Sequence, residues 1–409
     1  MACIIKMPSE KSKGVISFTN IEYFSQIKER AAALKLINCL KKSWVVCYHP
    51  NWEDHHFVDD GVFDCVLNVG SSFSFDKSSN GKKNLIGTCS NRMAPSEFNS
   101  IPTSRKCWDF CHVSRDQRSK NILGFFRVVK KALEKKKNLT GILIISVSDK
   151  KRMAKIRHEY ETIFSTKERH QFEFVTLTYN LPFPLSKKTL AHFYNFSKVS
   201  LNTHLNEPHG RVVGYSLASG LPVVGYFPIS EMVEKNYRKP PYFFLCNQGD
   251  EEGLASRLCE AVDYVQETYN EELHADMAKN FSELEQGYFL KRQLSEIFSL
   301  DLDLWNLYSL DLRLSWHYIL KSSVNSFNVS VYELLVYLNE NKVSGIKCDE
   351  ESIVDDISMF SRKRIGMYMK VLDWLTVRAP LEKKRFKKFV LEGNIYKLIR
   401  PLIRRLRAL

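Results

Sequence analysis

Between residues 108 and 224, short apolar runs alternate with longer amphipathic segments. The apolar runs, which have the length and composition of buried strands, are residues 108–113, 141–147, 172–178, 199–203 and 221–224. The amphipathic segments, in which apolar residues recur at helical spacing, are residues 121–137, 150–164, 186–195 and 211–219. Strands that alternate with helices in this way are typical of a parallel sheet covered on both faces. We therefore expect an α/β fold here.

The pattern is less regular on both sides of this region. The preceding segments that it predicts are a helix around 23–40, strands at 44–48 and 63–69, and a Ser/Gly-rich loop at 70–81. After it, residues 251–267 have helical spacing, and residues 300–409 contain no convincing strand, which predicts a helical appendage. The division that we predict is a short N-terminal lobe (1–104), a Rossmann-like lobe (105–290) and a helical extension (291–409).

The segment 197–224 bears most directly on function. A strand leads into a polar turn that ends at Gly210, a helix of small residues follows, and Gly220 ends that helix before the next strand. In parallel sheets, ligands bind at the carboxyl ends of strands, and the first turn of a helix attracts anions. Because Glu207 lies just before this helix, the segment predicts a phosphate site with an acid beside it.

The composition is that of a globular protein with anionic partners. Of the 409 residues, 44% are hydrophobic and 12% aromatic, and the formal net charge is +14. None of the ten cysteines forms a Cys-x-x-Cys pair, and Cys107, Cys111 and His112 come closest to a metal cluster. Their alternating pattern suits a strand better, so we expect no metal. With no apolar signal core or long apolar run, we expect a cytoplasmic protein with free thiols.

The C-terminal residues carry much of the positive charge. Between residues 383 and 409 there are ten Lys or Arg, and from 395 onward the apolar residues fall on one half of a helical wheel. The opposite half holds Lys397, Arg400, Arg404, Arg405 and Arg407. This segregation favours a helix that lies on an anionic membrane surface. The alternative is a helix that packs its apolar half on the protein body, and nothing in the pattern favours nucleic acid.

Three stretches together resemble the nucleotide-binding lobe of family 4 glycosyltransferases, the "group 1" enzymes of GT-B architecture. The stretches are 109–115 with 120–121, then 197–224, and finally 231–233 with 250–255. They occur in the family's order and extend over residues 105–290. The resemblance implies a GT-B-like fold of two Rossmann-like lobes, the first of them short in this chain, followed by the helical extension.

The resemblance also implies roles for individual residues. The residues that would hold the diphosphate of a nucleoside-diphosphate sugar are Arg115, Lys120, His209, Gly210 and Arg211. Glu207 would be the catalytic-site acid that contacts the donor sugar, and Tyr215 would face the ribose. An Arg fork, a Lys charge and backbone N–H groups suit a diphosphate chemically, and they require neither a metal nor another cofactor.

The sequence departs from the family pattern in several places. Tyr215 stands where the family has a second Glu, and Ser114 replaces the Gly before Arg115. Residues 226–228 replace a Gly-rich loop. The N-terminal lobe, which binds the acceptor in this family, is short and has no Gly-rich phosphate loop near residue 15. The identity of the acceptor therefore does not carry over.

A loop of the N-terminal lobe is rich in His and acidic residues. These are His49, His55 and His56 with Glu53, Asp54, Asp59 and Asp60. Three interpretations stay open: a surface loop without a dedicated role, a histidine that faces the transferred sugar, for which His49 is the candidate, or a metal site.

These observations predict a glycosyltransferase that moves a sugar, with retention, from a nucleoside diphosphate to a lipid-linked or polysaccharide acceptor. We expect it in the cytoplasm, peripheral on the inner face of a membrane. The alternative is a non-catalytic relative that serves as a binding or scaffold subunit. A sugar-nucleotide epimerase of the same architecture is a third class, and it would act without an acceptor.

Overall fold

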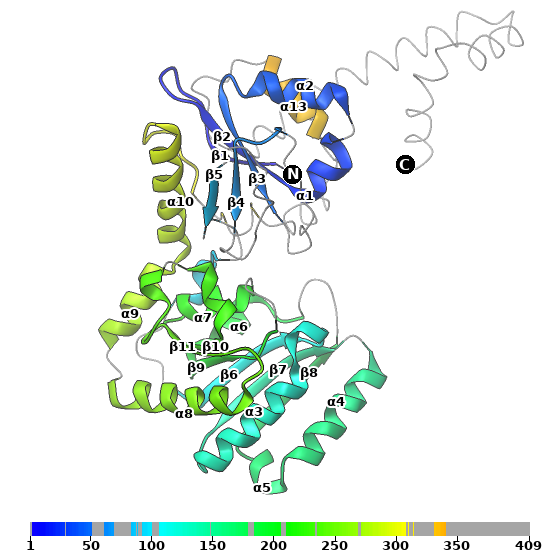
Figure 1. Ribbon diagram of the computed structural model, residues 1–409, viewed down its shortest axis with the longest axis vertical. Helices are drawn as coiled ribbons and strands as arrows, with labels where there is room; N and C mark the ends of the chain where they lie inside the picture. Colours follow the sequence, from blue (N-terminus) through cyan, green and yellow to red (C-terminus); the bar gives the residue numbers. More distant parts are fainter. Residues whose placement is uncertain are drawn as a thin grey trace, which may run out of the picture. The chain divides into compact units, whose positions relative to one another are not determined.

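The computed structural model describes residues 2–28, 30–50, 61–68, 83–86, 88, 92–99, 106–147, 149–178, 184–205, 210–233, 235–268, 271–307, 310, 314 and 331–340. Residues Met1–Cys348 form one compact unit and Asp349–Leu409 a second. All described residues belong to the first unit, which contains two sheets (Figure 1).

The first sheet has five strands in the order β1-β2-β3-β4-β5. Its strands are β1 (Cys3–Lys6), β2 (Gly14–Thr19), β3 (Trp44–His49), β4 (Cys65–Asn68) and β5 (Lys83–Ile86). β1 runs antiparallel to β2, and the other neighbours are parallel. Every residue of β1, β2 and β3 is buried, which is typical of a sheet covered on both faces.

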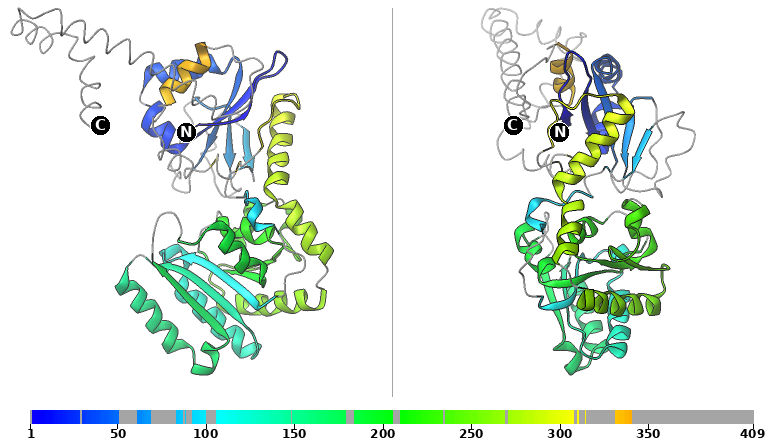
Figure 2. Two further views of the ribbon diagram at one scale, coloured as in Figure 1. Left: turned by 180° about the vertical axis from the view of Figure 1, so that it is seen from behind. Right: turned by 90° about the vertical axis from the view of Figure 1, so that its left-hand side faces the viewer.

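Helices from both ends of the chain cover this sheet (Figure 2). α10 (Glu283–Phe298) contributes Leu290 and Leu294 to one cluster with Val15 and Val45. The remaining elements are α1 (Asn20–Glu22), a π-helical turn (Tyr23–Ile27), α2 (Ala31–Leu40) and α13 (Val331–Glu340). Asn339 of α13 donates a hydrogen bond to the Leu36 carbonyl of α2 at 3.2 Å. Late segments of the chain therefore complete the core of the first lobe.

The second sheet has six parallel strands in the order β11-β10-β9-β6-β7-β8. Its strands are β6 (Trp108–Arg115), β7 (Gly141–Val147), β8 (Phe172–Thr178), β9 (Ser197–Asn202), β10 (Val223–Tyr226) and β11 (Phe243–Cys246). The sheet is the parallel, doubly covered α/β structure that the alternating pattern predicts.

Successive residues of each strand point to opposite faces, and each face has its own helices. Phe110 and Leu143 belong to the cluster beneath α3 (Ile122–Lys135), α4 (Lys150–Ile163) and α8 (Glu251–Thr268). Cys111 and Ile142 belong to the opposite cluster. The helices of that face are α6 (Lys187–Asn195) and α7 (Arg211–Ala218), with α9 (Glu271–Asn280) against α7. The remaining α5 (Thr166–Arg169) is a single turn before β8.

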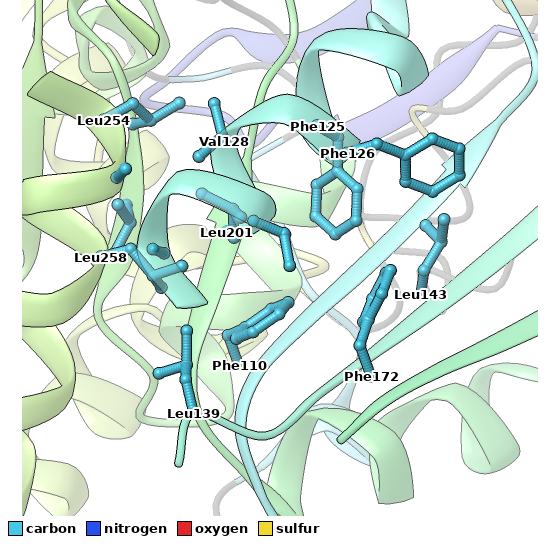
Figure 3. Packing of buried hydrophobic residues seen from close by; sticks show 14 of the residues in the cluster. Phe110, Phe125, Phe126, Val128, Leu139, Leu143, Phe172, Leu201, Leu254 and Leu258 are labelled. Carbon is cyan, nitrogen blue, oxygen red and sulfur yellow. The ribbon is translucent and has the colours of Figure 1, made fainter. Parts of the chain in front are cut away.

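Aromatic rings fill the first of these clusters. Phe110, Phe125, Phe126 and Phe172 point toward one another between the sheet and α3 (Figure 3). A Cβ atom on Gly141 would lie 2.1 Å from the Phe110 ring, so β7 starts with the residue that lets this ring lie flat on its neighbour strand. The cluster fixes α3, whose first turn lies at the carboxyl edge of the sheet.

Most predicted elements of the second lobe are confirmed. β7 and β8 have the predicted bounds, and the helices and other strands differ by a few residues at their ends. The helix predicted for 23–40 is wrong as one element: Arg30 is extended, so α2 starts only at Ala31. The sequence pattern did not indicate β1, β2, β5 and β11. Of the predicted helical extension (291–409), the structure describes residues 291–307, 310, 314 and 331–340, which include the end of α10 and all of α13.

Candidate functional site at the carboxyl edge of the second sheet

The strand order creates a switch point between β6 and β9. From β6 the chain proceeds to β7 and β8 on one side, then returns to place β9, β10 and β11 on the other side. In open parallel sheets, ligands bind where the loops after two such strands diverge. The loops that follow β6 and β9 contain the residues that the motifs single out. The tertiary structure therefore brings Arg115 and Lys120 to the same edge as the start of α7.

β6 ends in Arg115, which is half-buried. Ser114 before it is an ordinary strand residue whose Oγ donates to the Arg115 carbonyl at 3.0 Å. This position does not need the left-handed backbone conformation that favours glycine. The replacement of Gly by Ser therefore causes no backbone strain here. Asp116 is buried, and its carboxylate accepts from Arg152 Nε of α4 at 2.9 Å. This ion pair anchors the loop just beyond Arg115.

Lys120 ends a 3₁₀ turn (Arg118–Lys120). Asn121 follows in the left-handed conformation, with φ 52° and ψ 48°, and α3 starts one residue later. Asn tolerates this conformation better than other residues with a Cβ atom. The turn is tied to the loop after β9: Leu205 N–H donates to the Ser119 carbonyl at 2.8 Å, and Thr203 Oγ1 donates to the Lys120 carbonyl at 3.3 Å.

Two buried histidines lie beneath Lys120. His112 of β6 is 2% exposed and His204, after β9, is 6% exposed. Their rings meet edge to face with centroids 5.8 Å apart. Burial lowers the pKa of His112 to about 4, and the Lys120 charge contributes to this shift. The pKa of His204 lies well below its usual value because of burial, then Lys120 and His112. Both rings are therefore neutral at pH 7, and both lie within electrostatic reach of Lys120.

The start of α7 lies against His204. Gly210 is the N-cap residue, and as a glycine it has no side chain with which to cap the helix. A Cβ atom on Gly210 would lie 3.4 Å from His204 Nδ1, so this position is close to the ring. Arg211, the first helical residue, is half-buried. A helix N-terminus beside a cationic residue attracts anions.

His49 lies at the end of β3 in the first sheet. Its pKa is lowered to about 4 by burial and by the Arg211 charge, while a backbone hydrogen bond acts in the opposite direction. His49 therefore lies within electrostatic reach of the first residue of α7. The sequence selected both residues for the donor site, and the structure brings them near each other, although the role of His49 toward a sugar stays a prediction.

Tyr215 lies in the middle of α7, with its ring stacked on Phe98. The ring centroids are 4.1 Å apart, and the ring planes make an angle of 11°. Tyr215 also packs at the edge of the cluster that contains Cys111 and Leu190. Its ring is thus part of the packing between α7 and the segment around Phe98. Its contact with a ribose stays a prediction.

Several predicted residues lie outside the described part of the chain. These are Glu207, His209, His55, His56, Glu53, Asp54, Asp59, Asp60, Lys397, Arg400, Arg404, Arg405 and Arg407. Their predicted roles remain as the sequence suggests them.

The described residues contain no group of three or more His, Cys, Asp or Glu that could hold a metal ion. Cys111 and His112 are neighbours in β6 and point to opposite faces, so the strand interpretation of 107–111 is confirmed. A search of the same residues found no helix that is both long and apolar enough to cross a membrane.

Sequence reasoning passed over His112, Thr203 and His204 as parts of this site. Their signal was present, because each lies near the carboxyl end of a predicted strand. This signal could be interpreted only once the strand order was known, because nothing local in the sequence indicates that β9 pairs with β6.

A comparison with protein-family models found no match, and a comparison with curated proteins found none either. Among solved structures, TarM is 14% identical with a TM-score of 0.46, over 69% of this chain and 54% of TarM. The pneumococcal O-GlcNAc transferase GtfA, in complex with UDP and GlcNAc, is 13% identical with a TM-score of 0.43, over 64% of this chain and 54% of GtfA.

A third solved structure is α,α-trehalose 6-phosphate synthase from Burkholderia multivorans. It is 13% identical with a TM-score of 0.43, over 65% of this chain and 70% of that enzyme. The chain spans about half the length of TarM and GtfA. At these identities and TM-scores, the likeness carries no argument about activity.

Proposed function

We propose that the chain is a glycosyltransferase that takes its sugar from a nucleoside diphosphate. The observation that carries the proposal is that Arg115, Lys120 and the start of α7 follow β6 and β9, the two strands at the switch point of a parallel sheet. Two cationic side chains and a helix N-terminus form a suitable site for a diphosphate.

The proposed chemistry follows from charge. The bond between sugar and diphosphate breaks toward the diphosphate, which gains negative charge as it leaves. Arg115 and Lys120 would neutralise that charge, and the N–H groups at His209, Gly210 and Arg211 would add donors. Glu207 would contact the donor sugar and Tyr215 the ribose. Cationic side chains and N–H groups supply the electrostatic stabilisation, so the proposal includes no metal and no other cofactor.

The acceptor and the location are parts of the same proposal. A basic, amphipathic C-terminal segment supports attachment to the anionic inner face of a membrane. An enzyme held there meets lipid-linked acceptors and growing glycans. We therefore propose a lipid-linked or polysaccharide acceptor and transfer with retention, as in the family that the sequence resembles.

Calorimetry with a panel of nucleoside diphosphates tests the donor site. We expect binding of at least one of them, and Lys120→Ala should weaken it roughly 10- to 100-fold, the cost of a lost hydrogen bond to a charged group. Lys137→Ala, which removes an exposed charge just beyond the far end of α3, is the matched control and should bind like the wild type. An absence of binding across the whole panel would contradict the proposal.

The second candidate is a non-catalytic relative that keeps the fold and serves as a binding or scaffold subunit. The stacking of Tyr215 on Phe98 favours it, because a ring engaged in packing replaces a carboxylate of the family pattern. This candidate predicts nucleotide binding without turnover. Assays of donor consumption, with lipid-linked and glycan acceptors, separate the two candidates: released nucleoside diphosphate supports the enzyme.

A further inference from the structure

The second sheet opens between its two central strands before either strand ends. β6 and β9 pair from Trp108 opposite Ser197 to Cys111 opposite Ser200. Beyond that point β6 continues its pairing with β7 as far as Arg115, and β9 continues with β10 as far as Asn202. The last residues of each strand therefore belong to separate halves of the sheet. The loops that contain the proposed diphosphate-binding residues start where these two strands end.

His112 bridges the two strands at the first position beyond their pairing. Its Nδ1 lies 2.6 Å from the Leu201 carbonyl oxygen of β9. Because a carbonyl only accepts, Nδ1 must carry the proton, and the neutral ring has its lone pair on Nε2. Among the described residues, Nε2 has no hydrogen-bond partner. The His112 ring also stacks on Phe125 of α3, with the ring centroids 4.6 Å apart.

The ring contacts both halves of the candidate site. Through Phe125 it touches the first turns of α3, which follow Lys120 directly. Through His204 it reaches Gly210 at the start of α7, because His204 lies between them. Above the ring, the hydrogen bond from Leu205 to Ser119 joins the two loops again. The imidazole is thus a spacer of fixed width between the loop of Lys120 and the loop of Gly210.

We infer that His112 is a positioning residue, which sets the separation of β6 and β9 and thereby places Lys120 opposite the start of α7. The Nδ1–H bond to Leu201 replaces a backbone ladder bond at the point where the strands part. The ring volume keeps them apart, and the bond keeps them from separating further. The effect on ligand binding rests on the proposed function, whereas the effect on the two loops does not.

The matched variants are His112→Asn and His112→Phe. Asn keeps a side-chain N–H donor near the position of Nδ1, and Phe keeps the ring but removes the donor. We expect His112→Phe to raise hydrogen exchange in residues 116–121 and 203–205 about tenfold, the effect of one lost buried hydrogen bond. His112→Asn should stay within about threefold of the wild type. Exchange in β7 and β8 should be the same in all three proteins.

Calorimetry then tests the consequence for the site. We expect His112→Phe to bind about tenfold more weakly the nucleoside diphosphate that the wild type binds. His112→Asn should keep most of the wild-type affinity. In a Lys120→Ala background, the same His112→Phe change should have less than about a threefold effect, because its action passes through Lys120. A purely structural role would give equal effects in both backgrounds.

A third test uses the wild-type protein, so it does not depend on whether a variant folds. NMR of ¹⁵N-labelled histidines at pH 7 should show His112 as the Nδ1–H tautomer. An Nε2–H tautomer, or unchanged exchange in His112→Phe, overturns the inference whatever the ligand results are. If the exchange and the tautomer agree with the inference and no nucleoside diphosphate binds, the proposed function fails and the positioning role stands.

Discussion

At the scale of single residues, burial decides the chemistry of the histidines. His112, His49 and His274 are all buried, and burial is the main cause that lowers each pKa to about 4. In an unfolded chain, histidine titrates near 6.5. A histidine with a lowered pKa in the folded state opposes protonation, so the unfolded chain binds more protons below pH 6.5. These residues stabilise the fold fully above pH 6.5, and the contribution is lost as the pH falls toward 4.

This linkage gives a prediction for His112. Between pH 7 and pH 5, its titration should remove about 2 kcal/mol from the free energy of unfolding, from the difference between pKa values of about 4 and 6.5. His112→Asn does not titrate, so its free energy of unfolding should fall by about 2 kcal/mol less over this range. Urea denaturation at the two pH values measures the difference.

The control is His158→Asn, which changes an exposed histidine on α4. It should keep the pH dependence of the wild type. Equal pH dependence in the wild type and in His112→Asn would contradict the linkage, because it would mean that His112 has the same pKa in both states.

A second residue shows why parts of the first lobe escaped the sequence pattern. Lys6 at the end of β1 is 0% exposed, and its ammonium group lies 2.8 Å from a carboxylate oxygen of Asp301. A lysine interrupts an apolar run in the sequence, so β1 looks like a surface segment. Its burial depends on a partner far along the chain, since a buried charge needs a counter-charge.

At the scale of elements, the end of α7 follows from one residue. Gly220 has φ +71°, its N–H donates to the Leu217 carbonyl, and Leu221 N–H donates to the Ser216 carbonyl. This is the hydrogen-bond pattern of a helix that ends at a left-handed glycine. A Cβ atom on Gly220 would also lie 2.8 Å from the His274 carbonyl oxygen of α9. The predicted helix stop is confirmed, and the structure adds a close contact between α7 and α9.

Substitutions at two glycines separate the effect of backbone strain from the effect of the close contact with α9. Gly220→Ala should lower the free energy of unfolding by about 3 kcal/mol, since backbone strain and the clash with His274 add together. Gly249→Ala is the matched control, because Gly249 has φ +85° and nothing within 4 Å of a Cβ atom. Strain alone should make it about 1 kcal/mol less stable. Equal losses in the two variants, measured by denaturant unfolding, would exclude the contact with α9 as a cause.

The strands divide into those that the sequence predicts and those that it does not. β7 and β8 are seven residues each, and β7 is buried throughout, so their apolar runs are long enough to be recognised. Length alone does not separate the two groups, because the missed β2 has six buried residues, whereas the predicted β4 and β10 have four, like the missed β1, β5 and β11. The place of the missed strands in a sheet comes from pairing with neighbouring strands, which is information from elsewhere in the chain.

At the scale of the whole molecule, positive charge is concentrated near the C-terminus of the sequence. The formal net charge of +14 exceeds what the proposed diphosphate site needs, and the basic residues of 383–409 hold a large part of it. Such a segment gains about 1 kcal/mol per basic residue near an anionic surface. We therefore predict that deleting residues 394–409 releases the protein from anionic liposomes in co-sedimentation.

A charge-matched pair sharpens the test. Replacing Arg404, Arg405 and Arg407 by Gln should lower liposome binding roughly 100-fold. Replacing Lys150, Lys151 and Lys155 of α4 by Gln removes the same charge from an exposed helix and should have little effect. Equal losses in the two variants would mean that overall charge, and not the amphipathic segment, drives binding. Unchanged co-sedimentation after the deletion would favour a tail that packs on the protein body.

The sequence alone determined what depends on neighbouring residues. The alternation of apolar runs and amphipathic segments predicted a parallel sheet, and Gly220 predicted the end of α7, because periodicity and backbone freedom are local properties. The motifs selected Arg115, Lys120 and Gly210. Only the tertiary structure decided that these residues follow two neighbouring strands at one edge of a sheet. A strand exposes the same hydrogen-bonding edge to any partner, so the order β9-β6-β7 is set by packing across the whole sheet. That order brings the separate motifs to one edge of the sheet, and it makes His112 a bridge between β6 and β9.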